Sequence, residues 1–408
     1  MEKSDIKVKF LEQATTLSRG AEVLPGGVNE LARKLQKASE TNTPLRVKLG
    51  MDPTRPDLHL GHTVVMRKLK QFQEFGHKII LLVGAATAMI GDPSGKSDTR
   101  PSLTKEEVDE NAKTYFEQMS KVVDISKAEV VNNADWLHKM NLMDLIKLSS
   151  KVTVAQIMTR DDFAKRLQES KPISIHEFFY PLMQAYDSVE IDADIELGGT
   201  DQRFNVLLGR DIQSAYGKED PQMVLLLPLL EGTDGVVKMS KSYPEHCVSL
   251  TDVPKDMYGK LMSIPDEMIA KYYALLTDIS NEDLKQLEEQ LKNINPRDIK
   301  MKLAYTIVEM YHNKELADAA QNEFINVVQN KGIPEDIPEF KINDDISILE
   351  LVSQSGLEPS KSQIKRLLTS GAIKIDSEKI TDINYSVKKD ILPVVVQVGK
   401  RKFVKVIG

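Results

Sequence analysis

The order of elements across residues 45–83 constrains the fold of this chain more than any other feature of the sequence. Residues 45–51 predict a short strand, residues 61–75 an amphipathic helix, and the continuous apolar run at 78–83 a strand that is buried on both faces. A strand, a helix and a second strand in this order imply two parallel strands joined by a crossover helix. We therefore expect an α/β protein built on an open parallel sheet covered by helices.

The pattern continues along the chain and then changes twice. Further strands are expected at 129–132, 195–197 and 224–229, with a helical insertion near the middle of the sheet. From Val253 the apolar spacing is helical only, until a linker with glycine and proline at 331–345 leads into a small mixed module. We predict a sheet domain at residues 1–250, with an insertion at about 133–192. A helical domain at residues 251–332 and a small α+β domain at residues 345–408 are expected to follow.

Composition limits the function classes. The 408 residues include one cysteine, Cys247, which excludes an internal disulfide and a cysteine-based zinc site and suits a reducing cytoplasm. No apolar stretch follows Met1, so we expect no secretory signal, and the longest apolar run, 79–90, is too short to cross a bilayer as a helix. The formal net charge is −7, yet residues 341–408 hold 12 Lys or Arg against 8 Asp or Glu. This tail fits a nucleic-acid partner, although a balance of this size is also ordinary.

The first segment that carries chemistry is His59-Leu60-Gly61-His62, at the start of the first expected helix. In an open α/β sheet, ligands bind beyond the carboxyl ends of the strands, and a helix start there offers N–H groups and a positive dipole end to phosphate. Gly61 lets a nucleotide lie close to the backbone, and His59 and His62 can face the same phosphates. The alternatives are two surface imidazoles or a metal pair. Because no third ligand is evident, we expect no metal site.

The second segment is Lys238-Met239-Ser240-Lys241-Ser242, which follows a strongly apolar strand. Two lysines three apart on a loop can clamp phosphate and stabilise the charge that grows on a departing pyrophosphate, while a solvated loop is the alternative. Residues 91–97 are close to a P-loop, but three residues separate their glycines where that motif needs four, and Pro93 lacks an N–H group. We therefore reject a P-loop nucleotide site.

Together these segments resemble the bacterial tyrosyl-tRNA synthetases, in the subgroup with a Lys-Met-Ser-Lys-Ser loop. The resemblance covers nearly the whole chain. Residues 82–96 resemble the second sheet strand of that family with the loop beyond it, and residues 180–187 resemble its tyrosine-pocket helix. Residues 198–202 resemble its ribose-binding turn, and residues 346–375 resemble its S-four type RNA-binding module. The resemblance implies a Rossmann-like catalytic domain, an all-helical anticodon-binding domain and an S-four-like RNA-binding domain. It also implies a two-step reaction, in which tyrosine and ATP give tyrosyl-adenylate and pyrophosphate, and the tyrosyl group then passes to the terminal adenosine of tRNA(Tyr).

The resemblance implies the residues of the site as well. Those that act on the transition state are Thr54, His59, Lys238 and Lys241. Those that bind ATP are Asp52, Gly61, His62, Arg100, Gly199, Asp201 and Ser242. Those that bind tyrosine are Lys48, Asp92, Tyr180, Gln184, Asp187 and Gln202, of which Asp92, Tyr180 and Gln184 hold the ammonium and Asp187 holds the phenol hydroxyl. Because the attacking carboxylate of tyrosine is already ionised, catalysis needs alignment and charge stabilisation rather than a base.

One position departs from the family pattern. Where the family often has a tyrosine that helps to bind the phenol hydroxyl, this chain has Lys48. A buried pocket that bonds a hydroxyl rejects a substrate without one by roughly 10⁴–10⁵. We expect Asp187 to carry this discrimination, with Lys48 near enough to pair with it; the alternative is that Lys48 points to solvent.

The implied partners are tRNA(Tyr), L-tyrosine, ATP with its Mg²⁺ and a second copy of the chain, with residues around 151–171 at the homodimer interface. Lys361, Lys365 and Arg366 lie on one expected helix as a stripe for phosphate contact, although a solvated helix face would look the same. No membrane partner and no tightly bound cofactor are expected. The rival interpretations are a tryptophan enzyme of the same class, a small nucleotidyltransferase and an RNA-binding protein without catalysis. Asp187 argues against the tryptophan enzyme, and the additional domains argue against the nucleotidyltransferase. The intact catalytic residues argue against an RNA-binding protein without catalysis.

Overall fold

The computed structural model describes residues 6–53, 57–90, 105–329, 337–399 and 402–408. The chain divides into two compact units. The first unit lies within residues 1–253 and 260–311, and the second lies within residues 254–259 and 312–408.

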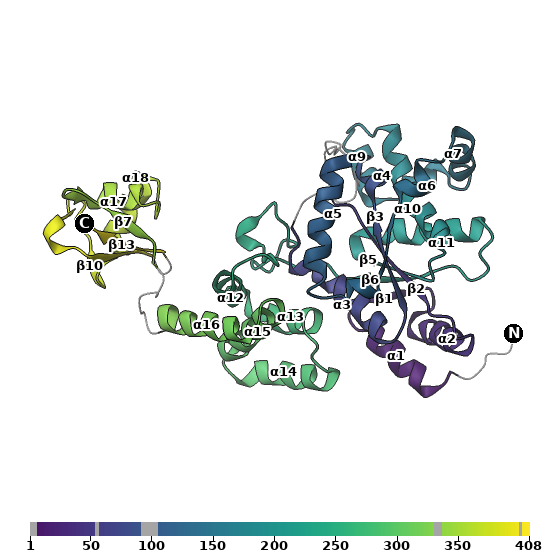
Figure 1. The fold of residues 1–408 in the computed structure, drawn as a ribbon, viewed down its shortest axis with the longest axis horizontal. Coiled ribbons are helices and arrows are strands. Elements are labelled where there is room, and N and C mark those ends of the chain that lie inside the picture. The colour runs from purple at the N-terminus through teal and green to yellow at the C-terminus, as the bar shows by residue number, and fades with distance from the viewer. Residues whose placement is uncertain (1–5, 54–56, 91–104, 330–336, 400–401) are drawn as a thin grey trace. The chain divides into compact units, whose positions relative to one another are not determined.

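A six-stranded sheet forms the centre of the first unit (Figure 1). Its order is β1-β6-β5-β2-β3-β4, and all neighbours are parallel except β1, which runs antiparallel to β6 at one edge. The strands are β1 (Glu22–Leu24), β2 (Arg46–Met51), β3 (Lys78–Val83), β4 (Glu129–Asn132), β5 (Ile195–Gly199) and β6 (Met223–Leu227). The predicted parallel sheet is confirmed. The edge strand β1 was not predicted, because only Val23 of its three residues is buried and the segment has no apolar run.

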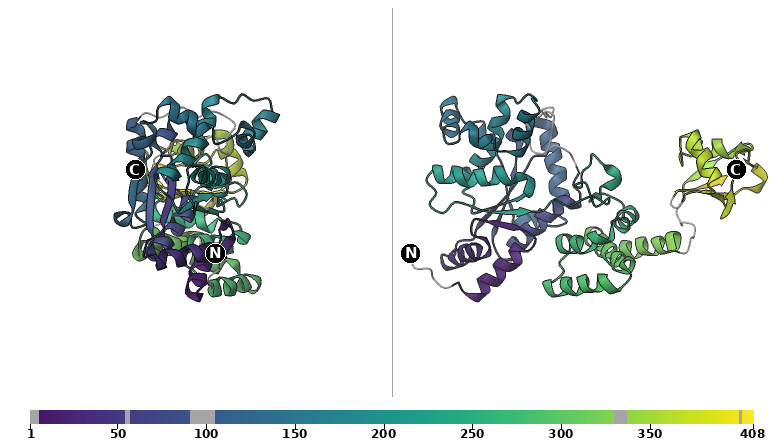
Figure 2. Two further views of the ribbon diagram at one scale, coloured as in Figure 1. Left: turned by 90° about the vertical axis from the view of Figure 1, so that its right-hand side faces the viewer. Right: turned by 180° about the vertical axis from the view of Figure 1, so that it is seen from behind.

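Helices cover both faces of this sheet (Figures 1 and 2). Strands place alternate side chains on opposite faces, and β6 buries all of its residues because both faces are covered. On the face toward α11, Val206 packs against Val224 and Leu226 of β6. The helices from the amino terminus to β6 are α1 (Val8–Ser18), α2 (Gly27–Glu40), α3 (Leu60–Glu74), α4 (Ala85–Ala88), α5 (Lys105–Met119), α6 (Ala134–Leu137), α7 (Leu142–Ser149), α8 (Val154–Ile157), α9 (Asp161–Gln168), α10 (Ile175–Glu190) and α11 (Arg203–Ala215).

The helices expected between β4 and β5 are present as α6 to α10. A buried ion pair fastens two of them, since Arg166 of α9 donates to both carboxylate oxygens of Glu177 of α10 at 2.5 and 2.9 Å. The α10 helix then packs along α11 and the sheet, where Ile191 and Ala193 meet Ile80 of β3. The ion pair thus fastens α9 to α10, the helix whose residues line the cavity described below.

Helices alone follow the sheet up to residue 329, as the apolar spacing predicted. They are α12 (Pro254–Met262), α13 (Ile269–Leu276), α14 (Asn281–Asn293), α15 (Pro296–Tyr311) and α16 (Lys314–Phe324), continued by a π-helical turn (Ile325–Gln329). Within the first unit, Arg67 of α3 forms an ion pair with Asp278, and Arg19 donates to the carbonyl of Ile279. These contacts attach the α13 end of the helical region to the sheet layer.

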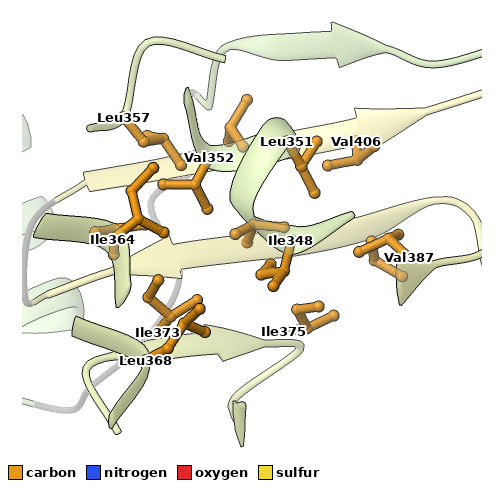
Figure 3. Close-up of a cluster of buried hydrophobic side chains, with 14 of the residues drawn as sticks. Ile348, Leu351, Val352, Leu357, Ile364, Leu368, Ile373, Ile375, Val387 and Val406 are labelled. Carbon is orange, nitrogen blue, oxygen red and sulfur yellow. The ribbon is translucent and has the colours of Figure 1, made fainter. Parts of the chain in front are cut away.

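The carboxyl-terminal residues form a small α+β module with its own core (Figure 3). Its main sheet has the order β10-β9-β12-β13-β7, antiparallel except between β13 and β7, and β11 pairs with β8. Leu351 and Ile364 from the two helices are fully buried against Val396 and Val406 of the sheet. The elements are β7 (Glu339–Lys341), β8 (Ile346–Ser347), α17 (Ile348–Gln354), α18 (Lys361–Thr369), β9 (Ile373–Ile375), β10 (Glu378–Ile380), β11 (Ser386–Val387), β12 (Val394–Val398) and β13 (Lys402–Ile407).

We predict that Leu351→Ala destabilises this module by about 2–5 kcal/mol, because it leaves a cavity in a closed core. Ile383→Ala is the matched control, since Ile383 is 37% exposed and its truncation should change stability by about 0.5 kcal/mol or less. Native-state hydrogen exchange at the amides of β12 and β13 measures both effects. Equal protection in the two variants would contradict the assigned core.

Candidate active site

The loops that follow three neighbouring strands meet at the carboxyl edge of the first sheet. β2 lies between β5 and β3, and all three run parallel. Their carboxyl ends therefore open onto one crevice, which is where open α/β sheets bind ligands. A cavity of about 280 Å³ lies here. Its lining includes Asp52, Tyr180, Gln184, Asp187, Gly199 and Gln202, which the sequence assigned to substrate binding.

The two motif segments lie side by side at this edge. Leu60 N–H donates to the carbonyl of Val248 at 3.0 Å, and Leu250 N–H donates to the carbonyl of Leu58 at 3.0 Å. The start of α3 is therefore tied to the chain that follows residues 238–242. This pairing brings together the histidines and lysines that the sequence placed at one nucleotide.

His59 and His62 begin α3 as neutral imidazoles. His59 Nδ1 accepts from Gly61 N–H at 3.2 Å, and His62 Nδ1 accepts from His59 N–H at 3.2 Å. Burial lowers the pKa of His59 to about 2 and that of His62 to about 4, and the nearby Lys241 charge adds to both shifts. Each ring therefore carries its proton on Nε2, from which it can donate to a phosphate oxygen. Gly61 is required, because a Cβ there would lie 3.0 Å from the His59 ring.

Both lysines of the second motif lie opposite carboxylates. Lys238 Nζ is 3.4 Å from Asp201 Oδ2, and Lys241 Nζ is 2.9 Å from Asp57 Oδ2. The second contact is an ion pair by distance without hydrogen-bond alignment, so the N–H groups of Lys241 stay available. Two cations beside a helix start can stabilise the negative charge of a triphosphate. Ser242 lies at the end of the same loop, where its N–H donates to Ser240 Oγ at 3.2 Å.

The base of this loop is held by α13. Glu231 pairs with Lys238 in a short antiparallel bridge. The Glu231 carboxylate accepts from Lys271 Nζ at 2.6 and 2.7 Å, and its carbonyl accepts from Tyr272 Oη at 2.7 Å. The helical region thus holds the loop of Lys238 and Lys241 through one residue, Glu231, that the sequence did not single out.

Asp187 lines the cavity together with two other acids, Asp52 and Glu196, and only 1% of its surface is exposed. Trp136 Nε1 donates to Asp187 Oδ1 at 2.9 Å, and Asn133 Nδ2 donates to Asp187 Oδ2 at 3.2 Å. Burial raises the pKa of Asp187 to about 7, while the Lys48 charge and these two donors oppose the rise. A carboxylate with one donor on each oxygen keeps lone pairs for a further hydroxyl.

Asp52 joins the cavity to the loop after β2. Tyr180 Oη donates to Asp52 Oδ2 at 2.8 Å, and Thr87 Oγ1 donates to Asp52 Oδ1 at 2.9 Å. Asn133 Nδ2 donates to Thr87 Oγ1 at 3.1 Å, so a continuous chain of hydrogen bonds connects Asp52 with Asp187. The sequence placed Tyr180 at the substrate ammonium and Asp52 at the adenylate; the structure puts the two side chains in direct contact.

Gln184 presents an unsatisfied acceptor to the same cavity. Its Oε1 is buried and has no hydrogen-bond partner among the residues described, a state that buried polar atoms rarely keep. Gln202 Oε1 accepts from Asn205 Nδ2 at 3.0 Å. A larger residue in place of Gly199 would displace the Asp201 carboxylate, because a Cβ there would lie 2.6 Å from Asp201 Oδ1.

Lys48 does not form the pair that the sequence predicted. Its side chain is fully buried, which also excludes the solvent alternative. Lys48 Nζ lies 3.0 Å from Glu196 Oε1, whereas the two oxygens of Asp187 are bonded by Trp136 and Asn133. The prediction was wrong because Glu196 is the residue directly opposite Lys48 in the β2–β5 register, and the sequence does not reveal that register.

Three predicted site residues, Thr54, Asp92 and Arg100, lie outside the described residues. The three predicted RNA contacts, Lys361, Lys365 and Arg366, are all exposed on α18, whose Ile364 and Leu368 are buried.

Other residues of the site were missed by sequence reasoning. They belong to no motif, and only the folded chain brings them to the cavity or the lysine loop. They are Asp57, Thr87, Asn133, Trp136, Glu196 and Glu231. Trp136 alone carried a signal, because it is the single tryptophan of the chain.

Comparison with known proteins agrees with this geometry. The family model for tRNA synthetases class I (W and Y) matches residues 40–329, and the model for the Tyrosine--tRNA ligase SYY-like C-terminal domain matches residues 329–406. The fold and the site therefore define a class I synthetase.

Known relatives narrow the class. A tyrosine–tRNA ligase of Carboxydothermus hydrogenoformans is 50% identical over 404 residues, 97% of both chains, and one of Thermotoga maritima is 54% identical over 366 residues, 89% of this chain and 90% of the other. The crystal structure of the Archaeoglobus fulgidus tyrosyl-tRNA synthetase with L-tyrosine has the same fold, with a TM-score of 0.62 at 24% identity over 76% of this chain and 99% of that one. The chain belongs to the tyrosine–tRNA ligase family, whose members join tyrosine to tRNA. The predictions of family, fold class and ligase activity are confirmed.

Within the described ranges, no three His, Cys, Asp or Glu side chains are grouped to hold a metal ion. Of the helices in the described parts of the chain, none combines the length and apolarity needed to span a bilayer.

We predict that Gly84→Ala strongly impairs tyrosine activation. A Cβ at this position would lie 2.0 Å from Asp52 Oδ1 and 2.5 Å from Thr87 Oγ1, so both side chains must move. A displacement of about 1 Å in a substrate-positioning group costs up to about a hundredfold in rate. The measurement is kcat/KM for tyrosine in pyrophosphate exchange. Gly259→Ala is the control, because its Cβ meets nothing within 4 Å; equal activity of the two variants would show that Asp52 need not lie where it does.

Proposed function

We propose that the cavity beside β2 binds the tyrosine substrate, with its phenol hydroxyl on Asp187 and its ammonium toward Asp52 and Gln184. The observation that carries this assignment is a buried carboxylate that is already held by Trp136 and Asn133 and still has lone pairs to accept a hydroxyl proton. The unsatisfied Gln184 Oε1 offers an acceptor for an ammonium N–H. Such a pocket selects tyrosine over phenylalanine, because phenylalanine would leave its buried polar groups unpaired.

ATP then lies between the start of α3 and the lysine loop. In this proposal the N–H groups of α3 and the Nε2–H donors of His59 and His62 face the phosphates, and Asp201 accepts from the ribose hydroxyls. Ribose binding at Asp201 releases Lys238, whose Nζ lies 3.4 Å from that carboxylate. Lys238 and Lys241 then stabilise the pyrophosphate that leaves as the tyrosine carboxylate attacks the α-phosphorus. Mg²⁺ accompanies ATP as part of the substrate.

In the second step the tyrosyl group passes to the ribose of the terminal adenosine of tRNA(Tyr). The exposed stripe of Lys361, Lys365 and Arg366 on α18 is proposed to hold tRNA phosphates, because positive side chains on one helix face can follow a nucleic-acid backbone. The helices from residue 251 to 332 are proposed to meet the anticodon. The reaction serves protein synthesis, and we place the enzyme in the cytoplasm.

We predict that replacing Lys361, Lys365 and Arg366 with alanine impairs tRNA charging but leaves tyrosine-dependent pyrophosphate exchange intact. Three lost phosphate contacts should reduce the slope of log affinity for tRNA against log salt by about three. Filter binding at several salt concentrations measures the slope. The control is Lys388→Ala/Lys389→Ala, which removes two exposed charges of the same module outside α18. If the slope changed by the same amount per removed charge in both variants, the α18 residues would have no specific role in tRNA binding.

We also propose that two copies of the chain associate through the helical insertion. This region exposes large apolar side chains, among them Leu142, Met143, Val154, Leu167 and Ile175. Several exposed apolar side chains in one region of a folded chain are a candidate interaction surface, whereas single ones such as Val8 are ordinary.

The predicted consequence is that Ile175→Asp gives monomers. Ile175 is 75% exposed at the first position of α10, where an acid suits the helix dipole, so the monomer should fold. Val8→Asp is the matched control, since Val8 is 70% exposed on α1. Sedimentation equilibrium of the two variants measures the association. A dimer that survives Ile175→Asp unchanged would place the interface elsewhere.

A further inference from the structure

Lys48 is fully buried and does not line the cavity. Its Nζ forms an ion pair with Glu196 Oε1 at 3.0 Å and donates to Ser188 Oγ at 2.9 Å and to the carbonyl of Gln184 at 3.3 Å. Lys48 therefore acts on the cavity through its neighbours.

The partner of Lys48 is equally well satisfied. Glu196 Oε2 accepts from Ser188 Oγ at 3.0 Å and from Gln222 Nε2 at 2.5 Å. The α11 helix can approach these groups only because it has Gly209 there, where a Cβ would lie 2.7 Å from Gln222 Nε2 and 3.1 Å from Glu196 Oε2. Glu196 also lines the cavity, so the pair connects the substrate site with the sheet.

Stability is a weak reason to bury such a pair. Taking two charges out of water is costly, and apolar residues of the same volume often stabilise a protein as well or better. The position of the pair suggests another role. Lys48 holds the carbonyl of Gln184 and the hydroxyl of Ser188, which are one turn apart on α10, and Asp187 lies between them on the same helix.

The charges around Asp187 can be named. Among the described residues, the titratable side chains that share its surroundings are Lys48 of β2, Glu196 of β5, Asp52 after β2 and Tyr180 of α10. The α4, α6 and α11 helices contribute uncharged groups, among them Thr87, Trp136 and Val206. Lys48 is therefore the cation that opposes the buried acids.

We propose that Lys48 and Glu196 are positioning residues for tyrosine selection, which fix the cavity face of α10 and keep Asp187 a hydrogen-bond acceptor. The inference rests on the role proposed above for Asp187. It assigns selection to a buried charge pair in the wall of the cavity as well as to Asp187.

The two partners act on Asp187 with opposite signs. Burial raises the pKa of Asp187, the charge of Lys48 lowers it and is the larger of the two partner effects, and the charge of Glu196 raises it. The acid must be ionised to accept the phenol proton, so kcat/KM for tyrosine should fall as the pH drops through about 7. Neutralising Glu196 alone should move this fall to lower pH. Neutralising both residues should move it to higher pH.

The experiment uses Glu196→Gln and the double variant Lys48→Met/Glu196→Gln in the full-length enzyme. The double variant keeps the shapes of both side chains and leaves no unpaired buried charge, so it should fold. We expect the midpoint of kcat/KM for tyrosine, measured by pyrophosphate exchange from pH 5.5 to 8.5, to shift by about one pH unit upward in the double variant and downward in Glu196→Gln. At pH 7 about one half of Asp187 should be ionised in the unmodified enzyme and about one tenth in the double variant. Selectivity for tyrosine over phenylalanine should therefore be roughly fivefold lower in the double variant.

Two further variants separate the possible outcomes. Arg166→Met/Glu177→Gln neutralises a buried ion pair between α9 and α10 that does not line the tyrosine cavity, and it should leave the midpoint in place. Asp187→Asn tests the acid itself, and retained selectivity in that variant would overturn the role of Asp187. If Asp187→Asn loses selectivity while the midpoints of the other variants stay fixed or shift together, the role of Asp187 stands and the role of the pair is overturned.

Discussion

The parallel pairing of β2 with β5 on one side and β3 on the other is the constraint on which the rest of the first unit depends. Parallel strands end at the same edge, so this arrangement delivers Asp52, Gly84 and Gly199 to one place although they are far apart in the chain. The same register sets Lys48 directly beside Glu196. One set of backbone hydrogen bonds therefore creates both the substrate crevice and the charge pair behind it.

The two parts of the crevice differ in electrostatic character, and the proposed placement of ATP and tyrosine follows this difference. Beside the start of α3, Lys238 and Lys241 supply positive charge, while burial keeps His59 and His62 neutral. Neutral rings leave the positive charge with the lysines, whose loop is held at its base by α13. Around Asp187 a chain of hydrogen bonds runs between two carboxylates, which suits the proposed tyrosine ligand with its ammonium at one end and its hydroxyl at the other.

The sequence was most informative where function and fold share a local pattern. Residues 78–83, of which 79–83 are buried, were recognised as a strand with the bounds that the structure has, and the two motif segments follow β2 and β6 of the same sheet along the chain. Sequence could not identify contacts that depend on register or on a returning helix. Trp136 and Asn133 reach Asp187 only because the insertion folds back, and Glu196 meets Lys48 only because β5 lies next to β2. The prediction placed Lys48 correctly near Asp187, but the ion-pair partner of Lys48 is Glu196.

That mistake bears on how Lys48 acts on the cavity. Lys48 does not line the cavity, so it affects Asp187 through its charge and through its hydrogen bonds to α10. Electrostatic effects are strong in the low-dielectric core, and unpaired buried groups are costly there. Glu196 lies 3.0 Å from Lys48, so the lysine is buried together with a carboxylate partner. Selection of a hydroxyl by an acid then depends on a balance of three buried charges, Lys48, Glu196 and Asp187, rather than on one added hydrogen bond.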